Sequence, residues 1–113
     1  MFVITLSHIV NVFVAGGIGI LLLMNFSSMT KVYGEATPAR SILTSVYLAI
    51  AITSLFALIF PSYSLAIAKV LFPLQILYKI STIFTVGTIV HPVVVSNIII
   101  SALHAVSLFI IFR

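Results

Sequence analysis

Residues 92–112 read PVVVSNIIISALHAVSLFIIF, a stretch without one charged side chain. A transmembrane helix needs about 20 mostly apolar residues to cross a hydrocarbon core of about 30 Å, and this stretch is long enough. Its runs, such as Ile98-Ile99-Ile100, are apolar on both faces, which favours a helix over a strand of a membrane barrel. Three further stretches have the same character: residues 2–25, 38–60 and 64–83. The sequence therefore predicts an all-α, four-helix transmembrane bundle, a polytopic integral membrane protein in which residues 1–113 form a single domain.

The composition agrees with this fold and excludes several kinds of chemistry. Hydrophobic residues make up 63% of the chain and charged residues 5%, against about 25% charged residues in a soluble domain. The single acid is Glu35 and cysteine is absent, which excludes catalysis by paired carboxylates and cysteine-ligated metal centres. The five basic residues are scattered, which argues against a nucleic-acid partner. We expect a lipid bilayer around the chain, and these absences favour a role other than that of an enzyme.

Proline and polar residues mark where two of the helices begin. Thr37 is expected to cap a helix whose first residue is Pro38. His91 stands beside Pro92 and is expected to be a solvated or capping residue. Both positions suit proline, because the amide at the first helical position needs no partner within the helix.

Two connecting segments follow the first and the third span. Residues 26–37 form the most polar stretch of the chain, and Glu35 there could pair with Arg40 at the start of the second span. We expect the third span to end near Ile83, so that residues 84–91 form a partly buried connection.

The even number of spans places both termini on one side of the membrane and the segments 26–37 and 84–91 on the other. Basic residues are more numerous on the connecting side, where Lys31, Arg40 and Lys79 lie, than on the side of the termini, where Lys69 and Arg113 lie. By the positive-inside rule this favours cytoplasmic connecting segments and termini outside, in a bacterial inner membrane.

The first span carries a stripe of small and polar residues at spacings of three and four: His8, Asn11, Ala15 and Gly19. This stripe should point into the bundle. By helical rise, His8 lies about 10 Å from the amino terminus and His104 about 13 Å from Arg113, so the two imidazoles sit at similar depth. Neutral imidazole is a good ligand of haem iron, and His8 and His104 could therefore hold haem b between the first and fourth spans. Alternatively, both histidines only form hydrogen bonds, to Asn11, to Ser101 or to each other.

Lys79 in the third span has two interpretations, and Gln75 lies on the same helical face. At the membrane interface, Lys79 would be an ordinary anchor. Buried in the bundle it would need a partner, and no span contains an acid. Backbone carbonyls or an anionic ligand would then have to serve, with Gln75 and Lys79 as contacts for a quinone or an anion.

The second span repeats small residues every four positions: Ser45, Ala49, Thr53 and Ala57. Such a ridge lets another helix approach closely. The leading hypothesis is a small membrane protein that acts through helix–helix association, as a homo-oligomer or as an accessory subunit of a membrane complex. Two alternatives are a redox anchor that binds haem b or quinone, and an oligomeric pore or carrier for a small anion or neutral solute.

Overall fold

The computed structural model describes residues 2–25 and 27–113, and within them four helices are long and apolar enough to span a membrane. The first span, Phe2–Leu23, consists of α1 (Phe2–Val10), a π-helical turn η1 (Asn11–Ala15) and α2 (Gly16–Leu23). The other long helices are α4 (Pro38–Ile59), α5 (Ser64–Val86) and α6 (Pro92–Phe112). The short helix α3 (Ser27–Tyr33) precedes α4, and a turn of 3-10 helix, η2 (Pro61–Tyr63), precedes α5. The predicted all-α, four-helix fold is confirmed.

The predicted caps at the starts of α4 and α6 are confirmed. The Thr37 hydroxyl accepts a hydrogen bond from the backbone N–H of Arg40. In the same way, Nδ1 of His91 accepts from the backbone N–H of Val93. Each side chain satisfies an amide that has no partner inside its helix.

The carboxyl end of α5 differs from the expected one. The helix continues beyond Ile83 to Val86 and stops where Gly87 adopts a left-handed conformation with φ +85°. Glycine terminates helices in this way because it has no Cβ to clash in that conformation. The apolar segment after Ile83 therefore remains helical until Gly87, where the chain changes direction.

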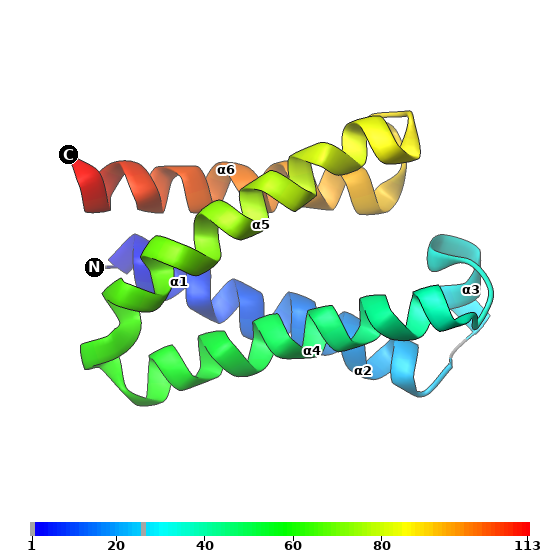
Figure 1. Cartoon of the computed structure of the whole chain (residues 1–113), viewed down its shortest axis with the longest axis horizontal. Coiled ribbons are helices and arrows are strands. Elements are labelled where there is room, and N and C mark those ends of the chain that lie inside the picture. Colours follow the sequence, from blue (N-terminus) through cyan, green and yellow to red (C-terminus); the bar gives the residue numbers. More distant parts are fainter. Residues whose placement is uncertain (1, 26) are drawn as a thin grey trace.

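The four spans form two pairs, the first span with α4 and α5 with α6, and the pairs contact each other mainly toward the end that holds the termini (Figure 1). The first span packs on α4, and α5 packs closely on α6, which also contacts α1. The two termini lie at the same end (Figure 1). The helices α4 and α5 are joined by the tight turn at η2 but diverge from it, so they contact each other less than either contacts its other neighbour (Figure 1).

The inward face predicted for the first span is confirmed, since its stripe of His8, Asn11, Ala15 and Gly19 is buried. A Cβ added to Gly19 would lie 2.8 Å from Cδ2 of Leu48, so the glycine allows α2 and α4 to approach closely. The π-helical turn begins at Asn11 and was not predicted. Such turns insert one extra residue into a helix and occur frequently at functional positions.

The segment 26–37 contains α3, which the sequence analysis did not predict, and its first residue, Phe26, lies outside the described residues. The expected pair of Glu35 and Arg40 is not formed in the described part of the chain. Instead the Arg40 guanidinium donates hydrogen bonds to the side chain of Asn25, the hydroxyl of Thr30 and the carbonyl of Gly34. Arg40 is only 6% exposed, so these oxygens tie the connecting segment to the start of α4.

Candidate functional site

The interior of the bundle is polar at its centre. Buried polar side chains from all four spans face one another there, and most of them are joined by hydrogen bonds: His8, Asn11, Ser54, Gln75, Lys79, Asn97, Ser101 and His104. In a bilayer no water is present to satisfy such groups, so their partners must come from the protein or from a ligand. These hydrogen bonds, together with the buried atoms left without one among the described residues (Tyr78 Oη, Ser101 Oγ and His104 Nδ1), define the candidate site.

Asn11 is the centre of the first cluster, which joins all four spans. Its Nδ2 donates to Oγ of Ser54 at 2.9 Å and to Oε1 of Gln75 at 2.8 Å. Its Oδ1 accepts from Nε2 of Gln75 at 3.0 Å and from Nε2 of His104 at 3.1 Å. Asn11 thus uses both donors and both lone pairs of its amide.

His8 continues this cluster on the side of α4 and α5. Its Nε2 lies 3.3 Å from the carbonyl oxygen of Ser64, and its Nδ1 lies 3.3 Å from Oγ of Ser54. Because a carbonyl can only accept, Nε2 carries the proton and Nδ1 accepts from the Ser54 hydroxyl. The imidazole of His8 therefore has a partner at each nitrogen.

Phe72 separates the two histidines that were predicted to face each other. Its ring centroid lies 4.9 Å from that of His8 and 4.5 Å from that of His104, and it stacks on His104 with an interplanar angle of 8°. Both Nε2 atoms are engaged in hydrogen bonds. The structure brings His8 and His104 to similar depth, as expected, but a haem iron between them would have to displace Phe72. The haem b site stays a prediction. The alternative was that the histidines only form hydrogen bonds, and the bond from His104 to Asn11 is one of those it predicted.

Lys79 forms the second cluster, closer to the connecting segments. Its side chain is 4% exposed, so it does not reach the surface as an interfacial anchor would. The ammonium donates to Oδ1 of Asn97 at 3.2 Å and lies 5.0 Å from the ring centroid of Tyr78 and 6.0 Å from that of Tyr47. Nδ2 of Asn97 donates in turn to the hydroxyl of Thr82 at 3.1 Å. A cation–π contact with two tyrosines stabilises the charge but does not neutralise it.

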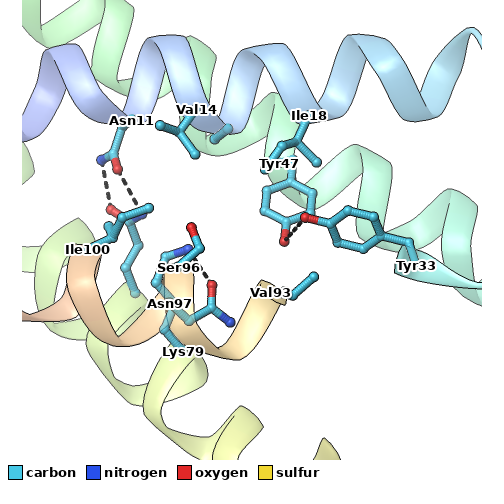
Figure 2. Close-up of a pocket in the computed structure, with 12 residues that line it drawn as sticks. Asn11, Val14, Ile18, Tyr33, Tyr47, Lys79, Val93, Ser96, Asn97 and Ile100 are labelled. Atoms are coloured by element: carbon cyan, nitrogen blue, oxygen red, sulfur yellow. Dashed lines mark hydrogen bonds between the residues drawn. The ribbon is translucent and has the colours of Figure 1, made fainter. Parts of the chain in front are cut away.

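A cavity of about 10 Å³ lies between the Asn11 cluster and Lys79 (Figure 2). Its walls combine apolar side chains with polar ones from five elements, the polar ones being Asn11, Tyr33, Tyr47, Gln75, Lys79, Ser96 and Asn97. The Ser96 hydroxyl and the Lys79 ammonium point into it from one side, and the hydroxyls of Tyr33 and Tyr47 stand across from them (Figure 2). The structure thus brings the predicted pair Gln75 and Lys79 to one cavity. This volume is close to the minimum that holds one water molecule, so a quinone ring does not fit without movement of the walls.

Tyr33 extends the site toward the connecting segment, and the sequence analysis had assigned it no part in it. The hydroxyl of Tyr47 donates to that of Tyr33 at 3.5 Å, and the two rings meet edge to face with centroids 6.0 Å apart. Burial raises the pKa of Tyr33, although the hydrogen bond from Tyr47 lowers it. The phenol of Tyr33 therefore stays neutral at physiological pH and keeps a proton that it can donate into the cavity.

The ridge of small residues on α4 lies partly on the outside of the bundle and partly in its interior. Ser45, Ala49 and Thr53 are exposed, whereas Ala57 is buried inside the bundle. A spacing of four residues drifts around a helix of 3.6 residues per turn, which explains the split. Ala49 and Thr53 line a hollow of about 560 Å³ between α4 and α5, where the two helices diverge. The other walls of this hollow are almost entirely apolar, among them Val46, Leu71 and Leu74.

Comparison of the chain with protein-family models, with curated proteins and with solved structures gives no match. Four helices that are long and apolar enough to span a membrane are compatible with a small membrane protein.

Proposed function

We propose that this protein acts through association of transmembrane helices, as a homo-oligomer or as an accessory subunit of a larger membrane complex. The observation that carries the proposal is the hollow between α4 and α5, which opens outward and exposes Ala49 and Thr53. A second hollow of about 370 Å³ adjoins it, since Thr53, Leu71 and Leu74 line both. Together they make an apolar groove along α4 and α5, which we call the α4/α5 groove.

The groove suits a helix because of the way helices associate in lipid. Apolar surfaces have no drive to leave a bilayer, so association depends on close packing at small residues. Ala49 and Thr53 offer such positions, and large side chains such as Val46 and Leu74 rise on either side of them. The partner that we expect first is a second copy of the chain, which would present the same groove.

Engineered cysteines test this contact without background, because the chain contains no cysteine. We expect Ala49→Cys to form a disulfide-linked dimer when membranes are oxidised. The control is Leu55→Cys, which lies on the same helix, is 44% exposed and does not line the groove. A dimer that forms equally with both variants, or with neither, would count against association of two copies through the α4/α5 groove.

We propose a bacterial inner membrane as the location, with the termini outside and the segments 26–37 and 84–91 cytoplasmic. The support is the excess of basic residues on the connecting side, Lys31 and Arg40 among them. Both termini lie at the opposite end of the bundle from these segments (Figure 1).

The two alternative functions have less support. For a redox anchor, His8 and His104 would have to exchange their present hydrogen bonds for iron, and Phe72 would have to leave the space between them. For a pore or carrier, Lys79 is a suitable contact for an anion, but the cavity beside it has only about 10 Å³. What that cavity can hold is a separate question from helix association.

A further inference from the structure

The amino group of Lys79 is buried inside the bundle, and no carboxylate pairs with it in the described part of the chain. The one acid of the sequence, Glu35, lies in the exposed connection before α4. An ammonium group has three N–H donors, and the structure gives Lys79 one hydrogen-bond acceptor, Oδ1 of Asn97. A buried charge without an opposite charge is costly, so an ammonium in this place either loses its proton or has an anion beside it.

The cavity next to Lys79 collects further donors from neighbouring elements. The Ser96 hydroxyl of α6 points into it beside the ammonium group (Figure 2). The Tyr33 hydroxyl stands across the cavity and accepts from Tyr47, which leaves the Tyr33 proton for another acceptor. The amides of Asn11 and Gln75 bond to each other and that of Asn97 bonds to Lys79. The other polar groups around the space are the Lys79 ammonium and hydroxyl donors, which have no shared acceptor.

The size of the cavity selects among possible occupants. A volume of about 10 Å³ has room for one particle of about the size of water. Phosphate, organic acids and quinones are much larger than this, and Lys79 would repel a cation. A chloride ion is only slightly larger than a water molecule, so a small shift of the side chains around the cavity admits it. Water fits, but it leaves the charge of Lys79 without a counter-charge.

We propose that the cavity beside Lys79 binds a single small monovalent anion of the chloride class, as the counter-ion of the Lys79 ammonium. The anion accepts hydrogen bonds from Lys79, from Ser96 and from Tyr33. This site is distinct from the α4/α5 groove, which opens on the outside of the bundle, although Gln75 contributes to the walls of both. An anion carrier would need a binding site of this kind, but the site alone does not imply transport.

Chloride binding to the purified protein in mild detergent tests the proposal through the broadening of the chloride NMR line. We expect excess broadening that saturates with chloride and is removed by bromide. Lys79→Gln should abolish it. The matched control is Lys69→Gln, the same substitution on the same helix at an exposed lysine, whose ammonium lies 5.9 Å from the Phe112 ring; it should bind as the original chain does. Absence of saturable broadening, or its persistence in Lys79→Gln, would overturn the proposal.

A second pair of variants keeps the test decisive if the loss of Lys79 unfolds the bundle. Ser96→Ala retains the charge and removes one donor, so the affinity for chloride should fall by about three- to tenfold, the usual worth of one hydrogen bond. Ser45→Ala is its control, since Ser45 is exposed and bonds to the carbonyl of Ser41 on its own helix. Equal chloride affinity of these two variants would show that the anion does not occupy this cavity.

Discussion

At the scale of the residue, the interior of this bundle is organised by one amide. Asn11 makes four hydrogen bonds to three side chains, Ser54, Gln75 and His104, from three different helices. The sequence made the inward face of the first span predictable, because His8, Asn11 and their neighbours repeat with helical spacing. It did not make the partners predictable. A phenylalanine in an apolar run carries no signal of its position, and Phe72 is the residue that separates the two histidines.

Replacing Asn11 with alanine should destabilise the protein, because Gln75 and His104 would lose partners in a place without water. Hydrogen bonds between transmembrane helices contribute about 0.6 kcal/mol each, so the loss of four predicts about 2 kcal/mol. Unfolding in mixed detergent micelles by increasing SDS measures this free energy. Ser81→Ala is the control, since Ser81 is exposed on α5 and bonds to the Tyr78 carbonyl of its own helix. Equal free energies of unfolding for the two variants would show that the hydrogen bonds of Asn11 do not stabilise the bundle.

At the scale of the element, the four long helices were predictable and the short irregular ones were not. Length and apolar character locate a span, and proline with a capping residue locates its start, as at Pro38 and Pro92. The π-helical turn at Asn11–Ala15 has no sequence signature of its own. The helix α3 was missed because its polar residues are typical of a connection, and its attachment depends on Arg40, which contacts Asn25 and Gly34 instead of Glu35.

Two glycines of α2 provide a matched test of the packing of α2 on α4. Gly19→Val should destabilise the bundle by about 1–3 kcal/mol, because its side chain would meet Leu48, which already lies 2.8 Å from a Cβ at this position. Gly17→Val has the same effect on helix propensity, but no atom lies within 4 Å of its Cβ. Thermal unfolding in detergent should therefore separate the two variants. Similar transition temperatures would mean that α2 and α4 are not in close contact at Gly19.

At the scale of the whole molecule, the bundle is closed on one side and open on another. Most of the polar side chains at its centre bond to one another and so hold the four spans together. Among the described residues, Tyr78 Oη, Ser101 Oγ and His104 Nδ1 are buried without a hydrogen-bond partner. The α4/α5 groove is different, since it leaves apolar walls and the small residues Ala49 and Thr53 on the outside. The ridge was predictable from the sequence, but the divergence of α4 from α5 was not, because a tight turn at η2 is compatible with close or open packing.

The mass of the native particle tests the proposed association most directly. Native mass spectrometry of the protein, extracted in a mild detergent and released from it in the gas phase, counts the chains in each particle. The expected result is a particle of two or more copies, or of one copy with a defined membrane partner, and a bulky Ala49→Trp variant in the α4/α5 groove should reduce it to a monomer. A monodisperse monomer of the original chain without any co-purified protein would contradict the proposal that this protein works through helix association.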